Sequence, residues 1–413
     1  MKKFKLLSLL VATFVVGFFF GNAIASQGGK QEDEFRYFRL FTDVFKTVKE
    51  NYVGEASTKE LIYGALNGMM KSLDPFSAFF TPEQYREFKQ ETEGEFGGVG
   101  IEIGMERGRP IVISPIEGTP AHRAGIRSGD VIIEINGEDT SNMSLTDVVK
   151  RIRGKPGTKV NLTIIRKGSD RPIKVELERA VIKIESVKWT RIDNIGYIRL
   201  SQFTDGVSKD VDRAIRSLLS QGVRGVILDL RNDPGGLLTE AINVSELFLK
   251  EGKLIVYTKT KKGEISRYFS RKKNVMDEGI PLVVLINRGS ASASEIVAGA
   301  LQDHKRAIIV GEKSFGKASV QNIIPLEDGS AIKLTVAHYY TPLGRLIDRK
   351  GIQPDVEVKM REDEEERLQE YIRQKRIEGA TGLVLEPSLD PQLNKAIEII
   401  KTGFKAHARD LSR

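Results

Sequence analysis

The chain has 413 residues, enough for two or three domains, and its 40% hydrophobic and 29% charged content is that of an ordinary soluble globular protein. The net charge of +8 includes three lysines close to the N-terminus, and the other basic residues do not cluster with aromatics, which disfavours nucleic acid as a partner. The absence of cysteine excludes a thiol nucleophile and a disulfide framework. No cluster of histidines and carboxylates indicates a metal, and no cofactor is expected.

The N-terminus predicts an exported protein. The basic stretch MKKFK is followed by an apolar run from Leu6 to Phe20 and by small residues at Ala23 and Ala25. This pattern is typical of a signal peptide over residues 1–25. Extended through Ala25, the run is about as long as the roughly 20 residues of a membrane-spanning helix, so cleavage and retention as an inner-membrane anchor both stay open. Either way the basic flank stays in the cytoplasm, which predicts the periplasm or the outer face of the cytoplasmic membrane for the rest.

Residues 35–94 are predicted to form an N-terminal helical region. Phe38, Phe41 and Phe45 recur at helical spacing in the first segment, and TKELIYGALNGMMKSL repeats the pattern until Asp74 and Pro75 end it. Such a preface packs on its own domain or on a second copy of the chain, so we hypothesise a homodimer or a higher homo-oligomer.

Residues 95–180 are rich in short strands punctuated by glycine. A glycine-rich turn, the segment GTPAHRAGIRSGDVIIEING, a helix over Leu145 to Ile152 and a closing strand over Val160 to Arg166 follow one another, and together they resemble a PDZ domain. Backbone N–H groups in the turn can take a carboxylate, and the edge of the following strand can pair with an extended peptide. The alternative is that the glycines only make a turn. The predicted peptide-binding residues are Gly97, Gly98, Val99, Gly100 and Ile101.

Residues 181–358 alternate apolar strands with helical segments, which predicts crossover connections and an α/β layer fold. In this core RGVILDLRNDPGG ends a strand in a Gly-Gly turn, and IPLVVLI is followed by a serine-rich turn and a helix. Residues 359–413 are predicted to be a helical tail, with a charged helix first and DPQLNKAIEII as a helix that docks on the core.

Three serines alternate with alanines in RGSASASEI: Ser290, Ser292 and Ser294. Ser292 and Glu295 match a capping box, which would make Ser292 the residue that begins the following helix. This structural reading and a nucleophilic role share one location, because unpaired N–H groups and the positive end of the helix dipole favour negative charge there.

A base for a serine nucleophile is not obvious among the four histidines. His338, inside an apolar strand, is the only one with a claim, and the chain has no G-x-S-x-G motif. The segment VGEKSFGKASVQ offers lysines instead, with a strand expected from Lys317 onward, so that Lys317, Ser319 and Gln321 share a face. An amine acts as a base only when uncharged, which requires a desolvated site. A solvated surface lysine is the alternative.

The motifs LDLRNDPGG, GSASASEI, GEKSFGKASVQ and TPLGRLIDRKGIQPDV follow the PDZ-like segment in this order. In this they resemble the C-terminal processing peptidases, serine proteases with a Ser-Lys dyad. The resemblance implies a multidomain α/β (α+β) fold, with a crotonase-like peptidase core and an inserted PDZ domain after N-terminal helices. It implies that Ser292 is the nucleophile, Lys317 its general base and Gln321 an orienting residue. It also implies that the N–H of Ala293 and one from Gly235 or Gly236 bind the oxyanion. Ala318 departs from the second glycine of the family's GKG pattern.

The expected function is therefore an exported endopeptidase that captures apolar C-termini of proteins or peptides and cleaves through an acyl-enzyme. Arg153, at the end of the helix that borders the peptide groove, is predicted to report occupancy by pairing with the core. A catalytically silent PDZ scaffold on a peptidase-like core is the alternative function. A trypsin-like protease would need a His-Asp pair and a glycine-containing serine motif, which the chain lacks.

Overall fold

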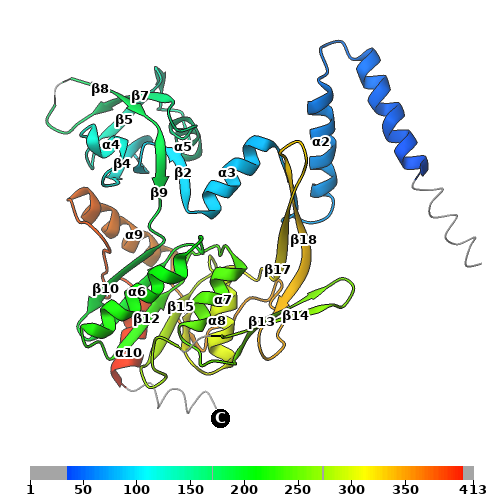
Figure 1. Ribbon diagram of the computed structural model, residues 1–413. Helices are drawn as coiled ribbons and strands as arrows, with labels where there is room; N and C mark the ends of the chain where they lie inside the picture. Colours follow the sequence, from blue (N-terminus) through cyan, green and yellow to red (C-terminus); the bar gives the residue numbers. More distant parts are fainter. Residues whose placement is uncertain (1–34, 170, 272–273, 403–413) are drawn as a thin grey trace, which may run out of the picture. The chain divides into compact units, whose positions relative to one another are not determined.

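The computed structural model describes residues 35–169, 171–271 and 274–402 (Figure 1). The predicted signal peptide or anchor over residues 1–25 lies outside this part of the chain. The structure divides into two compact units, one up to Phe79 and one from Phe80 onward, and each is described by itself. Among the described residues, no helix combines the length and the apolar character that crossing a bilayer requires.

The described part of the first unit, from residue 35 onward, contains two helices, as predicted. Residues 35–51 are helical, and α2 spans Thr58–Lys71 with Ser57 as its N-cap. The Asp74 carboxylate accepts the backbone N–H groups of Phe76 and Ser77, which forms the expected Asp-Pro turn after the helix. The short strand β1 (Ala78–Phe80) lies at the boundary between the units.

The second unit opens with α3 (Pro82–Thr92), which a capping box between Thr81 and Gln84 begins. A six-stranded antiparallel sheet follows, in the order β3-β4-β5-β7-β8 with β6 on β5. Its strands are β3 (Ile101–Glu106), β4 (Arg109–Pro115), β5 (Val131–Ile135), β6 (Glu138–Asp139), β7 (Lys159–Ile165) and β8 (Ile173–Glu178). The helices α4 (Pro120–Arg123) and α5 (Leu145–Ile152) complete it around an apolar core of their own. The helix predicted over Leu145 to Ile152 is confirmed, and β3 lies at the sheet edge, as a peptide-pairing strand requires.

The chain enters and leaves this small domain through a pair of antiparallel strands. Before it lies β2 (Glu95–Gly98), and after it β9 (Ala180–Lys183), and the two pair with each other. This differs from the prediction in one respect, because Gly97 and Gly98 belong to β2 and only Val99 and Gly100 turn into β3. An inserted domain requires the chain to leave and return to the core at neighbouring points, and the pairing of β2 with β9 meets this requirement.

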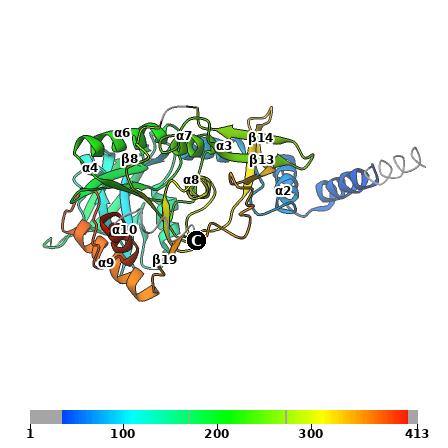
Figure 2. The same cartoon turned by 90° about the horizontal axis from the view of Figure 1, so that it is seen from below.

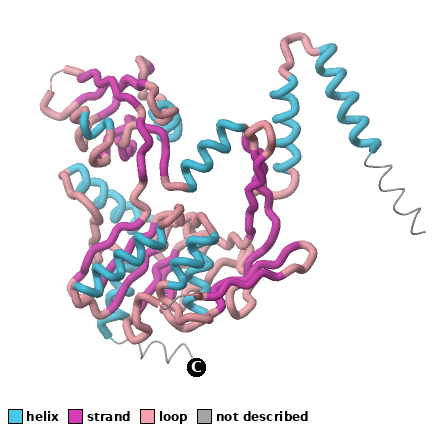
Figure 3. The backbone as a smooth tube through the Cα atoms, in the orientation of Figure 1, coloured by secondary structure: helices cyan, strands magenta, loops and turns pink. Residues whose placement is uncertain are grey.

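The core is built on a six-stranded sheet in the order β10-β11-β12-β15-β16-β19 (Figure 3). The strands from β11 to β19 are parallel and β10 is antiparallel to β11. Their bounds are β10 (Val187–Ile192), β11 (Ile195–Leu200), β12 (Gly225–Asp229), β15 (Leu282–Ile286), β16 (Ile308–Gly311) and β19 (Val356–Glu357). Parallel neighbours joined through helices confirm the predicted α/β core.

Helices cover both faces of this sheet. On one face α6 (Val207–Ser220), α7 (Leu238–Glu246) and α8 (Ala293–Asp303) pack on Ile198, Leu228 and Val284, and on the other α10 (Pro391–Thr402) packs on Tyr197, Ile227 and Val283. Successive strand residues point to opposite faces, so both faces of these strands are buried and the sequence runs are continuously apolar. Figure 2 shows α6 and α7 on one side of the sheet and α10 on the other.

A second sheet flanks the core, in the order β14-β13-β18-β17 within the second unit. It comprises β13 (Leu254–Thr260), β14 (Ile265–Phe269), β17 (Ser319–Pro325) and β18 (Ala331–Tyr340). The charged helix expected in the tail is α9 (Glu362–Ile377), and the expected docking helix is α10. The predicted fold class, a multidomain α/β (α+β) chain with N-terminal helices and an inserted small domain, is confirmed.

Candidate active site

The three loops that carry the predicted site residues follow three neighbouring parallel strands. The Gly235-Gly236 turn comes after β12, the serine run after β15 and the Lys317 loop after β16. The carboxyl ends of parallel strands meet at one edge of a sheet, which is where ligands bind in open α/β folds. The topology therefore brings together segments that lie far apart in the sequence.

The structure separates the three serines by their hydrogen bonds. Ser290 is fully buried and its hydroxyl donates to the carbonyl of Leu230 at 2.8 Å. Ser294 is fully buried and donates to the carbonyl of Asp233 at 3.0 Å. Ser292 between them is half-buried, and the Glu295 N–H bonds its backbone carbonyl at 2.9 Å. Ser290 and Ser294 hold the loop together, which leaves Ser292 as the candidate nucleophile.

Ser292 has an unusual backbone conformation, with φ 54° and ψ −110° at the N-cap of α8. A non-glycine residue in such a region costs about 1–3 kcal/mol, and it persists only where its surroundings enforce it. Its neighbour Ala293 is the first residue of α8, so the N–H of Ala293 has no acceptor within the helix. A strained serine followed by an unpaired helical N–H is an arrangement that can support nucleophilic attack and bind an oxyanion.

The buried carboxylate of Glu295 joins the serine loop to the lysine loop. It accepts the Ser292 N–H at 2.8 Å, the Gly316 N–H at 2.7 Å and the Lys317 N–H at 2.9 Å. The Ser314 hydroxyl is a fourth donor, at 2.5 Å. Burial raises the pKa of Glu295, and these four hydrogen bonds act in the opposite direction. The predicted link between Ser292 and Glu295 is thus present, and the same carboxylate also fixes the backbone of Lys317.

Tyr339 makes a second connection between the same two residues. Its buried hydroxyl lies 3.0 Å from the carbonyl oxygen of Ser292 and also contacts the carbonyl of Lys317. Glu295 therefore holds the N–H groups of residues 292 and 317, and Tyr339 holds their carbonyl groups. Two buried side chains set the backbone separation of the candidate nucleophile and the candidate base.

The Lys317 loop differs from its prediction in where the strand begins. β17 starts at Ser319, after Lys317, because Gly316 with φ 91° turns the chain and the Lys317 N–H bonds Glu295 instead of a neighbouring strand. Gln321 donates to the hydroxyls of Ser319 at 2.8 Å and Thr335 at 3.3 Å. Gln321 and Ser319 thus share a face, as predicted.

The glycine turn lies against the candidate nucleophile. A Cβ on Gly235 would come within 2.8 Å of Ser292 Cβ and of the Ala293 nitrogen, so only glycine fits there. The Gly235 N–H donates to Asp233 Oδ1 at 2.8 Å, and the Asp233 carbonyl accepts the Ala291 N–H at 3.0 Å. Gly235 is therefore held at the serine loop, and Gly236 packs against the backbone of Phe203.

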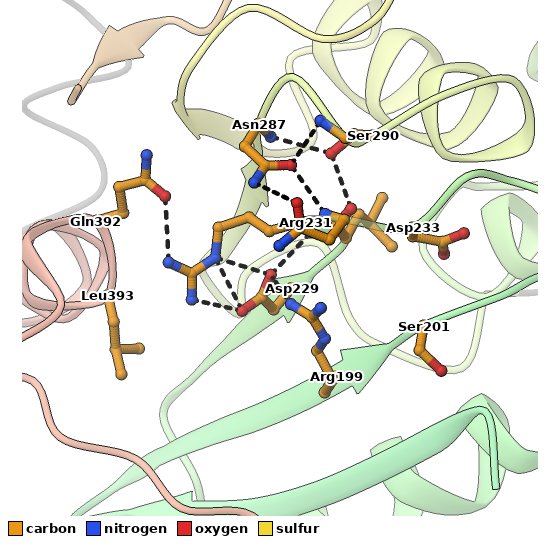
Figure 4. A network of polar contacts seen from close by, with 12 residues as sticks. Arg199, Ser201, Asp229, Arg231, Asp233, Asn287, Ser290, Gln392 and Leu393 are labelled. Atoms are coloured by element: carbon orange, nitrogen blue, oxygen red, sulfur yellow. Dashed lines mark hydrogen bonds and ion pairs between the residues drawn. The ribbon is translucent and has the colours of Figure 1, made fainter. Parts of the chain in front are cut away.

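Below this turn lies a buried network of ion pairs, drawn in Figure 4. The Arg231 guanidinium binds Asp229 and Asp390, and Arg199 binds Asp229 at 2.9 Å. Burial alone would raise the pKa of Asp229, but Arg231 and Arg199 outweigh it and hold the pKa well below its ordinary value. Asp390 belongs to the start of α10, so the network fixes the C-terminal helix to the strand that carries the glycine turn.

The other predicted residues lie in the small antiparallel domain. Val99 is buried in its core, and Gly100, with φ 78°, packs so closely on Thr119 that an added Cβ would lie 2.3 Å away. Arg153 caps α5, and its guanidinium lies over the Phe96 ring at 4.6 Å and 3.8 Å from Glu91. Its contacts are thus with β2 and α3 in this structure. Among the described residues, no group of side chains fits a metal ion.

Comparisons with known proteins assign the domains. Residues 194–358 match the peptidase family S41, residues 87–165 a PDZ domain, and residues 21–84 the N-terminal domain of the activating protease CtpB. The chain is 39% identical over 422 residues to a carboxy-terminal-processing protease of Bartonella bacilliformis, covering 96% of this chain and 97% of the relative. The chain belongs to the C-terminal processing peptidases. It is thus a serine-type peptidase, and the predicted family and enzyme class are confirmed.

Other similar proteins agree with this. A carboxyl-terminal-processing protease of Synechocystis is 42% identical over 317 residues, covering 75% of this peptidase and 74% of the relative. The solved structure of a photosystem II D1 C-terminal processing protease superposes with a TM-score of 0.50 at 32% identity, covering 78% of this chain and 92% of that one. The PDZ and peptidase domains together support protein or peptide substrates.

Sequence reasoning missed three residues of the site. Glu295 was read only as a capping partner, and its bonds to the Lys317 loop come from tertiary structure. Tyr339 was part of an apolar strand, with no signal that its hydroxyl contacts both loops. Asp233 was read as part of a tight turn, although an aspartate ahead of Pro-Gly-Gly at the end of a buried strand was a signal for a buried acid.

Proposed function

We propose that the peptidase cleaves by a Ser-Lys dyad, with Ser292 as nucleophile and Lys317 as general base. The observation that carries this proposal is the difference between the three serines. The hydroxyls of Ser290 and Ser294 donate hydrogen bonds to backbone carbonyls, whereas Ser292, between them, has a positive φ of 54°. Glu295 and Tyr339 support the pairing, since each contacts the backbones of both residues 292 and 317.

The chemistry proceeds through an acyl-enzyme. The Ser292 hydroxyl gives its proton to the uncharged Lys317 amine as its oxygen bonds to the scissile carbonyl carbon, and the amine passes that proton to the leaving nitrogen. Lys317 then takes a proton from water as the water oxygen attacks the ester carbonyl, and the amine returns that proton to the Ser292 oxygen as the carboxylic acid product leaves. Gln321 is proposed to orient the amine. Its side chain donates a hydrogen bond to Ser319, two residues after Lys317, which supports a location of the Gln321 amide near the Lys317 loop.

The negative charge of the tetrahedral intermediate needs N–H donors. We assign one to Ala293, which begins α8, and one to the Gly235-Gly236 turn, which contacts Ser292. In this state the Gly235 N–H is engaged by Asp233, so Gly235 can complete the pair only when that hydrogen bond is released.

The PDZ domain is proposed to capture apolar C-termini of protein substrates. Its edge strand β3 can pair with an extended chain, and the Val99-Gly100 turn precedes it. Gly97, Gly98 and Ile101 flank that turn in the pairing strands. Arg153 is proposed to couple occupancy of the groove to the active site, and its contacts with Phe96 in β2 and Glu91 in α3 support a route through these elements, which lead into the domain.

The cellular setting is proposed from the sequence. The basic and apolar N-terminal segment supports export, to the periplasm or the outer face of the cytoplasmic membrane, with possible retention at the inner membrane. Residues 35–51 form a helix that exposes several large apolar side chains, among them Phe35, Phe38 and Leu40. A helix of this kind supports association with a second copy of the chain.

The test is to purify Ser292→Ala, Lys317→Ala and, as a matched control from the same loop, Lys313→Ala. The substrate is an unstructured protein with an apolar C-terminus. We expect Ser292→Ala and Lys317→Ala to lose cleavage while keeping their circular dichroism spectra, and Lys313→Ala, an exposed lysine, to cleave normally. Cleavage retained in either of the first two variants contradicts the dyad.

The alternative, a silent PDZ scaffold, predicts capture without cleavage. It gives no reason for a strained serine joined through two buried side chains to a lysine loop. Wild-type protein that binds the C-terminal peptide but leaves the substrate intact would favour the scaffold.

A further inference from the structure

The proposed mechanism leaves one buried acid beside the nucleophile unused. The side chain of Asp233 is completely buried in the turn between β12 and α7. Its Oδ1 accepts the Gly235 N–H at 2.8 Å, whereas Oδ2 is buried and has no hydrogen-bond partner in the part of the chain that the structure describes. Figure 4 shows this carboxyl pointing away from the Asp229–Arg231 ion pairs.

Among the residues that the structure describes, no cation forms an ion pair with this carboxyl. Arg199 lowers its pKa electrostatically, but the Arg199 guanidinium binds Asp229 at 2.9 Å. Arg231 is bound by Asp229 and Asp390, and the Asp229 carboxylate itself repels a second negative charge. The Ser294 hydroxyl and the Gly235 N–H are its polar neighbours. A buried carboxylate with one hydrogen bond and no ion pair is costly, so the neutral acid is favoured. Burial raises the pKa of Asp233 to about 8.

Residue 233 also ties the oxyanion turn to the serine loop. Its carbonyl accepts the Ala291 N–H at 3.0 Å and the Ser294 hydroxyl at 3.0 Å. The glycine that its side chain holds, Gly235, lies against Ser292 and Ala293. A charge on Asp233 therefore lies on a carboxyl that is hydrogen-bonded to one of the N–H groups proposed to bind the oxyanion.

We propose that Asp233 is a positioning residue that works as a neutral acid, and that its ionisation switches the peptidase off at alkaline pH. Two effects act together. A carboxylate repels the negative charge that develops on the substrate oxygen, and it holds the Gly235 N–H more strongly than a neutral carboxyl does. The proposal rests on the proposed function in taking Ser292 as nucleophile and this turn as the oxyanion site.

The expected signature is an alkaline limb in kcat. Once Asp233 ionises, activity falls tenfold for each further pH unit, and the fall is in kcat because the peptide-capturing PDZ groove is not involved. In Asp233→Asn the amide oxygen still accepts the Gly235 N–H and the side chain cannot ionise. We expect this variant to stay within about threefold of wild type at neutral pH and to lose the alkaline limb.

The experiment measures kcat and KM of full-length wild type, Asp233→Asn and Asp193→Asn from pH 6 to pH 10. Asp193 is an exposed acid paired with Lys401 and serves as the matched control, with an unchanged profile expected. An alkaline limb that persists in Asp233→Asn overturns the proposal. So does a loss of more than about a hundredfold at every pH, since that means the negative charge is needed.

A second measurement is independent of activity and uses the Ser292→Ala background. Because the folded state keeps the Asp233 proton up to about pH 8 and the unfolded state releases it near its ordinary value, the stability of the parent falls with pH between these limits. The melting temperature of Asp233→Asn relative to the parent should rise from pH 5 to pH 8 and then level off. A difference that does not vary with pH overturns the proposal. If Ser292→Ala still cleaves, the dyad fails, and this stability test stands unaffected.

Discussion

At the residue scale, the conformation of Ser292 is the feature that distinguishes it from its neighbours. A positive φ of 54° is unfavourable for alanine and serine and free of cost for glycine. We expect Ser292→Gly to be more stable than Ser292→Ala by about 1 kcal/mol, although both are inactive. Urea denaturation of the two variants measures the difference. Equal stability, or a more stable alanine variant, would show that the backbone conformation at residue 292 carries no energetic cost.

Glu295 is expected to affect catalysis through position. Glu295→Gln replaces one acceptor oxygen by an NH₂ group, so either the N–H groups of Ser292 and Lys317 or the N–H of Gly316 lose their acceptor. We expect kcat to fall by about a hundredfold with little change in KM, because the PDZ groove is untouched. Glu327→Gln, at an exposed turn, is the control. A normal kcat in Glu295→Gln would mean that this carboxylate is not needed to position Ser292 and Lys317.

The sequence identifies Ser292 only as one of two things, a cap or a nucleophile, and the structure confirms that it is the N-cap of α8. It could not show that the neighbouring serines donate to Leu230 and Asp233, because those carbonyls lie more than fifty residues away in the chain. Tyr339 is missed for the same reason, because its hydroxyl contacts the carbonyls of Ser292 and Lys317 in other loops.

At the scale of elements, periodicity predicted most helices and strands because their apolar faces are buried as expected. Lys317 was placed in a strand that begins at Ser319, and Gly97 and Gly98 were placed in a turn although they pair with β9. In both cases a tertiary contact decided the outcome, a hydrogen bond from Lys317 to Glu295 in one and the exit strand of the PDZ domain in the other.

The helix α10 offers a matched comparison of two ion pairs. Asp390, at its start, binds the buried Arg231, whereas Lys401, near its end, pairs with Asp193 on the surface. We expect Asp390→Ala to destabilise the fold by about 3 kcal/mol, because it leaves a buried guanidinium undercompensated. Asp193→Ala should cost less than about 0.5 kcal/mol. Similar losses in urea denaturation would mean that the buried network does not fix α10.

At the scale of the whole molecule, three segments distant in sequence meet because they follow adjacent parallel strands. The order of β12, β15 and β16 places the glycine turn, the serine run and the lysine loop at one sheet edge. Sequence alone indicates an α/β core, whereas the order of the strands is a tertiary property that periodicity does not encode.

Association of chains is the prediction at this scale. Phe38 is 72% exposed on the helix of residues 35–51, and Arg39 lies on the same helix. We expect Phe38→Asp to reduce the mass of the full chain carrying Ser292→Ala in analytical ultracentrifugation, and Arg39→Asp to leave it unchanged. A wild-type chain that sediments as a monomer contradicts the prediction.

The central claim is that Lys317 removes the proton of Ser292, and labelling with a serine-reactive fluorophosphonate tests it most directly. Peptide mapping by mass spectrometry identifies the modified residue, and the labelling rate is compared between wild type, Lys317→Ala and Lys313→Ala. The account predicts an adduct on Ser292, formed at least about a hundredfold more slowly in Lys317→Ala and at the normal rate in Lys313→Ala. An adduct on another residue, or equal rates in all three proteins, would contradict it.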